Sequence, residues 1–115
     1  MRSPPIESAE QSVMARVGFV MRLKPGNEAI YRQKHDEIWP EMVSALHGYS
    51  IRNYTIFLSG LTLFAYYETD DPSRQNAQRD DPVIQRWWRM MQPYMDYNPD
   101  GTPWSEPIQE VFHLD

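Results

Sequence analysis

The stretch Ala15-Arg-Val-Gly-Phe-Val-Met-Arg-Leu23 has an apolar residue at every second position, and it decides the fold that we expect. Successive side chains of a β-strand point to opposite faces, so this alternation predicts a strand with one buried face. Lys24-Pro25-Gly26-Asn27 then breaks the pattern, and Asn27 can cap a following helix. The residues expected on the buried face are Ala15, Val17, Phe19, Met21 and Leu23.

From Glu28 the apolar spacing lengthens to that of a helix. Side chains spaced 4, 3, 4 and 3 apart form one helical stripe, made of Tyr31, His35, Ile38, Met42 and Ala45. Pro40 disfavours helical geometry at Trp39 and removes one backbone hydrogen bond, so we expect a kink or a restart there. Gly48 is expected to end the helical segment as its C-terminal cap.

The next segment predicts a β-hairpin. Residues 50–58 and 61–68 are rich in β-branched and aromatic residues, and Ser59-Gly60 is a short turn between them. Strict alternation in the first of these strands would place Tyr54 and Ile56 on one face. The opposite face would then carry Ile51, Asn53, Thr55 and Phe57.

A second helix and a last strand complete the expected order. Asp71-Pro72 and Asp81-Pro82 are helix-start signals, and the better helix runs from Pro82 to about Tyr94. Residues 96–107 are expected to form an irregular loop, and residues 108–114 to form the last strand. The inner side of the second helix is expected to carry Val83, Trp87, Met90, Met91 and Tyr94.

The order β-α-β-β-α-β is typical of the ferredoxin-like α+β fold. In this fold a four-stranded antiparallel sheet carries both helices on one face. The other face would carry Val20, Tyr54, Ile56 and Val111, which are too apolar to leave in water. We therefore expect a homodimer in which two sheets pack face to face.

Composition excludes several classes of function. The net charge is −5 and the basic residues never cluster, so neither nucleic acid nor a membrane surface is an expected partner. Without cysteine there is no disulfide or thiolate chemistry, which is compatible with the cytoplasmic location that we expect. Residues 1–14 lack the apolar core of a signal peptide. They are expected to be a polar tail ahead of a single domain, residues 15–115.

Proton transfer is the chemistry that the remaining side chains favour. The three histidines lack metal-ligand spacing, and phosphate-binding glycine loops and nucleophile elbows are absent, so we expect neither metal nor cofactor. His35 lies one helical turn after Tyr31 and could act as an acid or base, or simply satisfy a buried polar group. Trp87, Trp88 and Tyr54 could line a sugar site, or belong to the core and a subunit contact.

Five separated motifs resemble the L-rhamnose mutarotase family, from about Arg16 to the C-terminus. None of the motifs lies in the segment up to Met14. The motifs are Tyr31 with His35-Asp-Glu-Ile-Trp-Pro-Glu41, Arg52-Asn53-Tyr54 with Ile56, Gln85-Arg86-Trp87-Trp88 with Met91, Asn98-Pro99-Asp100, and Glu110-Val-Phe-His-Leu114.

The resemblance implies a dimeric α+β barrel that interconverts the α and β anomers of L-rhamnose without metal or cofactor. It implies that His35 is the catalytic proton-transferring residue, and that Tyr31, Tyr54, Trp87 and Trp88 contact the sugar. The acid/base partner at the anomeric hydroxyl stays open between water, a tyrosine and a carboxylate. Two alternatives remain on such a scaffold: a cofactor-free monooxygenase and a non-catalytic sugar-binding protein.

Overall fold

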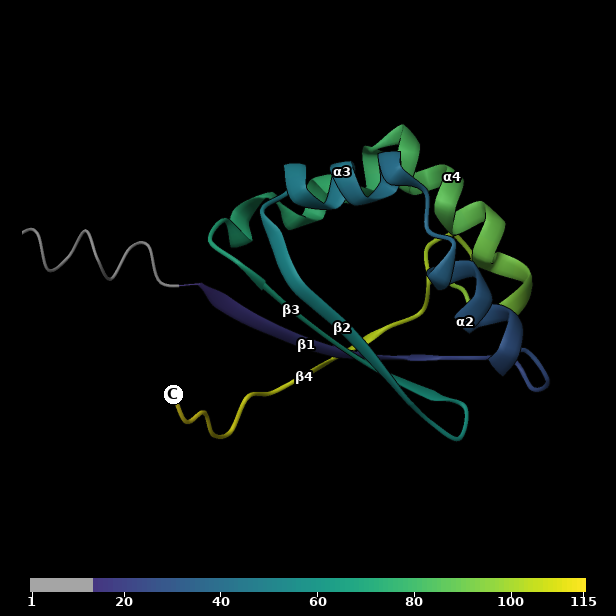
Figure 1. Cartoon of the computed structure of the whole chain (residues 1–115), viewed down its shortest axis with the longest axis horizontal. Coiled ribbons are helices and arrows are strands. Elements are labelled where there is room, and N and C mark those ends of the chain that lie inside the picture. Colours follow the sequence, from purple (N-terminus) through teal and green to yellow (C-terminus); the bar gives the residue numbers. More distant parts are fainter. Residues whose placement is uncertain (1–13) are drawn as a thin grey trace, which may run out of the picture.

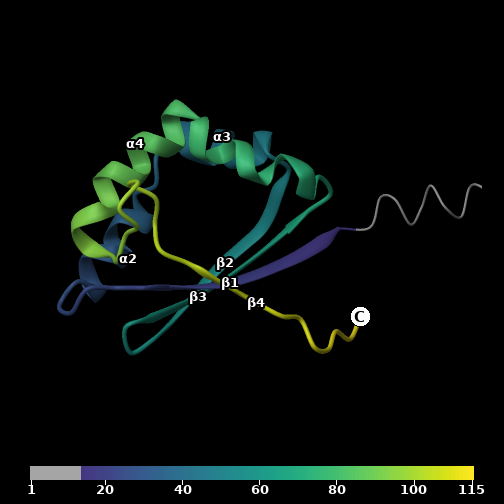
Figure 2. The ribbon, with the colours of Figure 1, turned by 180° about the vertical axis from the view of Figure 1, so that it is seen from behind.

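Residues 14–115 are described by a computed structural model, in which helices cover one side of a four-stranded antiparallel sheet (Figure 1). The strand order is β2-β3-β1-β4. The view from behind shows the same layers, with the helices on one side of the sheet and the other side uncovered by any helix of residues 14–115 (Figure 2). The predicted α+β class and antiparallel sheet are confirmed. The elements are β1 (Ala15–Arg22), α2 (Glu28–Asp36), α3 (Pro40–Gly48), β2 (Ile51–Ser59), β3 (Thr62–Thr69), η1 (Pro72–Asp80), α4 (Pro82–Met91), η2 (Gln92–Tyr94) and β4 (Glu106–Ile108).

The core lies between the sheet and the helices. The buried face predicted for β1 is confirmed, because Met21 and Leu23 are buried and Phe19 packs against the same cluster. Leu63 of β3 lies directly opposite Met21 across the strand pair. Ile84 of α4, which the sequence reading left out of the inner face, is completely buried. These contacts fix the helical layer over the middle of the sheet.

Pro40 restarts the helix, as expected. α2 ends at Asp36, and Trp39 takes an extended conformation before Pro40 begins α3. The expected cap at Gly48 is wrong. α3 includes Gly48, and the N–H groups of Tyr49 and Ser50 still bond to helix carbonyls. The backbone takes positive φ only at Ser50 (φ 60°), two residues after the expected cap.

The N-terminus of α4 follows its sequence signal. The Asp81 carboxylate accepts hydrogen bonds from the backbone N–H groups of Val83 (2.8 Å) and Ile84 (3.3 Å). Pro82 occupies the first turn, where its missing N–H costs nothing. The α-helix ends at Met91, and η2 carries the chain on to Tyr94, the expected end.

The strict alternation predicted for β2 is wrong. A β-bulge between Arg52 and Thr55 sets two residues against one of β3, and Asn53 has positive φ (53°). The extra residue reverses which face each later side chain occupies. Ile56 consequently lies opposite the buried Ala65, on the helix side, and Tyr54 lies against Tyr67.

The last strand begins two residues earlier than predicted, within the expected loop, and is much shorter. β4 pairs with β1 only over Glu106–Ile108, and residues 109–115 have no regular structure. Ile108 lies on the open face, whereas strict alternation would place it on the face opposite Val111; its side chain is beside Gly18 of β1. Val111, predicted for a sheet face, is 88% exposed on this C-terminal segment instead.

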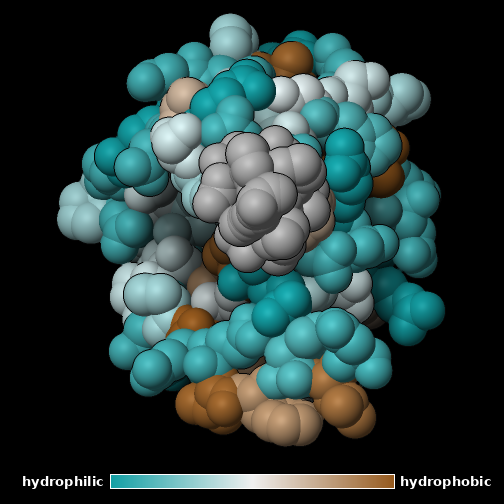
Figure 3. Space-filling model, turned by 90° about the vertical axis from the view of Figure 1, so that its left-hand side faces the viewer, coloured by the Kyte–Doolittle hydropathy of each residue, from teal (hydrophilic) through white to brown (hydrophobic). Residues whose placement is uncertain are grey.

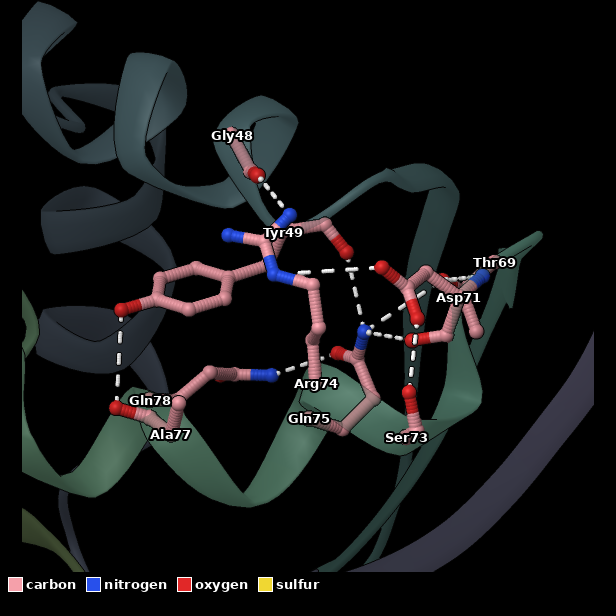
Figure 4. Close-up of polar contacts among 9 residues, drawn as sticks. All are labelled: Gly48, Tyr49, Thr69, Asp71, Ser73, Arg74, Gln75, Ala77 and Gln78. Carbon is pink, nitrogen blue, oxygen red and sulfur yellow. Dashed lines mark hydrogen bonds and ion pairs between the residues drawn. The ribbon is translucent and has the colours of Figure 1, made fainter.

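A polar network fastens η1 to its neighbours (Figure 4). The side-chain amide of Gln75 donates to the Tyr49 carbonyl at 2.9 Å and to the Asp71 carbonyl at 3.0 Å. Thr69, which is fully buried, accepts from the backbone N–H of Asp71 at 3.0 Å. These bonds join the end of α3, the end of β3 and the segment that leads into α4.

The open face of the sheet is apolar, and Val20 lies on it as expected, but Phe57 and Phe64 occupy it in place of Tyr54, Ile56 and Val111. Val20, Phe57 and Phe64 share it by cross-strand pairing, and Phe57 is 64% exposed. Figure 3 shows apolar side chains gathered at the lower edge of the molecule, on the side away from the helices. No helix in residues 14–115 is long and apolar enough to cross a membrane. The expected tail, residues 1–14, lies outside the described residues except for Met14, so the division at residue 15 stays a prediction.

Candidate active site

An open cavity of about 1150 Å³ lies between the helices and the helix side of the sheet. The sequence-predicted site residues come from α2, β2 and α4, and all of them line this cavity: Tyr31, His35, Tyr54, Trp87 and Trp88. Tyr54 reaches it only because the bulge in β2 turns its side chain to the helix side. The fold thus brings together three segments that are far apart in the chain.

His35 is held in one orientation by its own helix. Its Nδ1 lies 2.9 Å from the backbone carbonyl oxygen of Tyr31, one turn earlier in α2. A carbonyl can only accept, so Nδ1 carries the hydrogen and donates it. In the neutral ring, Nε2 is then left with a free lone pair, which suits it to accept a proton.

Aromatic rings flank the His35 imidazole on two sides. The Tyr31 ring lies 4.3 Å away between centroids, and the Trp87 ring meets it edge-on at 5.4 Å. Desolvation among these rings lowers the pKa of His35 below its ordinary 6.5, and the Tyr31 carbonyl and the Asp36 charge offset this only in part. The neutral form of His35 therefore predominates at pH 7.

The adjacent tryptophans of α4 differ in burial, as expected for neighbours 100° apart on a helix. Trp87 is 6% exposed and belongs to the core cluster, whereas Trp88 is half-buried and packs against it. Trp39 meets the Trp87 ring edge-on at 5.2 Å, so it supports the wall that touches His35. In the sequence Trp39 stands before Pro40 and within the first motif, and neither feature predicts its contact with Trp87.

Two tyrosine hydroxyls face the cavity from opposite layers. Tyr31 is buried, and desolvation raises its pKa well above the usual value. Tyr54 leaves 39% of its surface exposed, yet its hydroxyl is desolvated inside the cavity, and its pKa is raised as well. Both groups stay protonated across the working pH range, so they can donate hydrogen bonds but cannot serve as phenolate bases.

The cavity has the chemistry of a polar ligand site with an aromatic wall. Asn53 and Tyr97 also line it, and neither was expected there from the sequence. Asn53 was detectable in principle, because an Asn inside a strand is a common bulge residue with positive φ. Tyr97 follows η2 in an irregular loop, where no periodicity indicates which side chains point inward. Within residues 14–115, no three His, Asp or Glu side chains lie close enough together to hold a metal ion.

The chain is similar in sequence to known L-rhamnose mutarotases over most of its length. A family model described as L-rhamnose mutarotase matches residues 16–114. The L-rhamnose mutarotase of Listeria monocytogenes is 42% identical over 103 residues, which are 88% of this chain and 99% of that protein. That of Lactiplantibacillus plantarum is 43% identical over 104 residues, covering 89% of this chain and all of that protein.

Solved structures agree with this similarity. The L-rhamnose mutarotase of Formosa agariphila superposes with a TM-score of 0.81 at 31% identity, covering 88% of this chain and 99% of that one. The tetracenomycin F2 cyclase of Streptomyces glaucescens, at 20% identity and a TM-score of 0.58 over 88% of this chain and 97% of that one, shares the fold alone. The chain belongs to the L-rhamnose mutarotase family.

Proposed function

We propose that this chain interconverts the α and β anomers of L-rhamnose, as an isomerase of rhamnose metabolism, with His35 moving the proton at the ring oxygen. One observation supports the proposal above all. The chain belongs to this family, and its His35 lines the same cavity as the four residues proposed to contact the sugar, Tyr31, Tyr54, Trp87 and Trp88. We also propose a cytoplasmic location, with which the absence of cysteine from the sequence is compatible.

The reaction needs proton transfer and little else. Ring opening breaks the bond between C1 and the ring oxygen, and one proton moves, in net terms, from the anomeric hydroxyl to that oxygen. The resulting aldehyde rotates, and reclosure from its other face reverses the same steps. Neutral His35 takes the anomeric proton on Nε2, directly or through a bound water, and the imidazolium then gives that proton to the ring oxygen as the bond to C1 breaks, so the imidazole is neutral again once the aldehyde has formed.

The aromatic residues would hold the sugar while the proton moves. The Trp87 and Trp88 rings offer flat apolar surfaces to the C–H face of the pyranose and to its C6 methyl group. The Tyr31 and Tyr54 hydroxyls would donate hydrogen bonds to sugar hydroxyls, because their raised pKa values keep them protonated. Because both phenols stay protonated, neither is the base that takes the anomeric proton; a bound water would relay that proton to Nε2 of His35.

A cofactor-free monooxygenase is the weaker alternative. An aromatic substrate would favour a cavity with few hydrogen-bonding groups, whereas this one presents the imidazole of His35 and the phenols of Tyr31 and Tyr54. A non-catalytic sugar-binding protein would have the same cavity, so only a rate measurement separates it from an enzyme.

Exchange between the two anomers tests the proposed function directly. We expect saturation-transfer NMR to show α–β exchange of L-rhamnose that accelerates in proportion to the protein concentration. L-Rhamnose binding without acceleration would instead identify a sugar-binding protein. No binding and no acceleration would reject both sugar functions.

We also propose a homodimer in which the open faces of two sheets pack together. Phe57 and Phe64 are 64% and 40% exposed there, and Ile108, at the far edge of the same face, is 48% exposed. Large apolar side chains clustered on a flat sheet face are typical of a subunit interface. A second copy of this face would be self-complementary around a twofold axis.

Phe64→Glu should convert the proposed dimer to a monomer. Phe64 pairs with both Val20 and Phe57, so a carboxylate at this position would be buried without a partner in the interface. Light scattering after size-exclusion chromatography should show the mass halved. Gln33→Glu, which introduces the same carboxylate at an exposed position of α2, should leave the mass unchanged. A wild-type chain of monomer mass at micromolar concentration would contradict the proposal.

A further inference from the structure

The C-terminus of α4 has an unusual hydrogen-bond partner. The last four carbonyls of an α-helix lack the N–H groups that would follow in a longer helix. Here the N–H of Gln92 bonds to the Arg89 carbonyl, in the tighter pattern of η2, and Pro93 has no N–H to offer. The Trp88 carbonyl accepts instead from the Tyr97 hydroxyl, at 2.6 Å.

Tyr97 is itself held in place by the loop after η2. Its backbone forms a bridge with Pro103, and the neighbouring Asn98 bonds to Thr102 through both its backbone (2.8 Å) and its side chain (3.0 Å). One residue earlier, the N–H of Asp96 donates to the Arg22 carbonyl at the end of β1. The phenol therefore reaches α4 from a loop that is fixed to the sheet.

Three residues of this arrangement form one part of the cavity wall: Trp88, Tyr97 and Pro103. We propose that Tyr97 is a positioning residue for sugar binding, whose hydroxyl caps α4 at the Trp88 carbonyl and fixes the direction of the Trp88 indole. The inference rests on the proposed function, because it assigns Trp88 to the sugar. Desolvation raises the pKa of Tyr97, so the phenol keeps the proton that it donates.

Tyr97→Phe removes the hydroxyl and keeps the ring. Loss of one buried hydrogen bond that orders the binding wall should raise both the KM and the directly measured Kd for L-rhamnose by about three- to ten-fold. The kcat should change by less than about two-fold, because the Tyr97 hydroxyl bonds to the Trp88 carbonyl, whereas the rings against His35 are those of Tyr31 and Trp87. Isothermal titration calorimetry gives the Kd, and NMR exchange rates give KM and kcat.

Tyr49→Phe is the matched control at the other end of the same helix. The Tyr49 hydroxyl donates to the Asp81 carboxylate at 3.0 Å, and Asp81 caps the N-terminus of α4. Figure 4 shows the Tyr49 ring lying over η1, and Tyr49 does not line the cavity. This variant also loses a hydrogen bond to an end of α4, but its KM and Kd should stay within about two-fold of the wild type.

A double-mutant cycle with Trp88→Ala decides between positioning and direct contact. The alanine keeps the carbonyl that Tyr97 caps but has no indole to direct, so adding Tyr97→Phe should change the Kd by less than about two-fold. An equal effect of Tyr97→Phe in both backgrounds would overturn the inference and make the phenol a direct sugar contact. An unchanged Kd in the single variant would overturn it too.

The same measurements separate this inference from the proposed function. If the wild-type chain binds L-rhamnose but does not accelerate exchange, the mutarotase activity fails while the Kd comparison still tests Tyr97. If exchange is accelerated and Tyr97→Phe matches Tyr49→Phe in Kd, the positioning role fails and the activity stands.

Discussion

Replacing His35 by glutamine should slow α–β exchange of L-rhamnose by about 10²- to 10⁴-fold in kcat, the usual contribution of one general acid/base group. Glutamine retains hydrogen-bonding capacity but does not titrate, so proton transfer is the property that is removed. Saturation-transfer NMR at pH 7.5 measures the rate. His35→Ala should lose a similar share of the activity while L-rhamnose still binds, because the aromatic wall and the tyrosine hydroxyls remain.

The pH dependence gives an independent check of the same assignment. The pKa of His35 lies below 6.5, and the lone pair on Nε2 exists only in the neutral ring. The kcat/KM should therefore be constant above about pH 7 and fall as the pH decreases through the His35 pKa, approaching tenfold per unit. A kcat/KM that rises instead as the ring becomes protonated would contradict this role of the neutral imidazole.

His113→Gln controls for loss of a histidine elsewhere. His113 lies in the C-terminal segment, paired with Asp115 at 2.8 Å, and does not line the cavity. Its replacement should leave kcat and the pH profile unchanged. If His35→Gln equilibrates the anomers at the wild-type rate, the assignment of His35 as the proton-transferring residue is wrong.

Trp87→Ala has the second largest expected effect, and it falls on stability. Trp87 is buried and contacts both His35 and Trp39, so truncation leaves a cavity in the core and should cost about 3–5 kcal/mol in the free energy of unfolding. For a domain of this size that is a large part of the total stability. Thermal unfolding should show Tm lowered by about 10 °C or more.

Two related variants separate the structural and catalytic parts of this effect. Trp87→Phe keeps most of the packing and should fold, with a smaller loss of Tm than Trp87→Ala. Its smaller ring changes the edge contact with His35, so kcat should still fall. Trp88→Ala removes a half-buried ring and should weaken L-rhamnose binding with a smaller loss of Tm. Equal stability losses for Trp87→Ala and Trp88→Ala would contradict the difference in burial.

The hydrophobic pattern correctly predicted which side chains face the core wherever a single periodicity continued through the element. The alternation from Ala15 to Leu23 predicted the buried face of β1, and the helical stripe predicted that Tyr31 and His35 face inward. Pro40 and Asp81 gave correct helix starts, because a missing N–H and a capping carboxylate act within one turn of the chain.

Pattern failed where one residue changed the register. Asn53 adopts positive φ in a bulge, and this turns Tyr54 from the open face to the cavity. Ile51 and Ile56 are five positions apart in one strand. Two apolar residues at an odd spacing can share a face only if a bulge lies between them, so this spacing was a sign of the bulge. The last strand was overestimated for a related reason, since alternation in residues 108–114 cannot show where pairing with β1 ends.

The sequence by itself determined the order of the elements, the antiparallel α+β class and, through five motifs, the family and five candidate site residues. Each of these depends on neighbours within a few positions or on similarity along the chain. Only the tertiary structure decided that these residues share one cavity, that Trp39 supports Trp87, and that Tyr97 bonds to the Trp88 carbonyl. Such contacts join side chains across separate segments, and their geometry depends on bulges, helix ends and packing that no local repeat specifies.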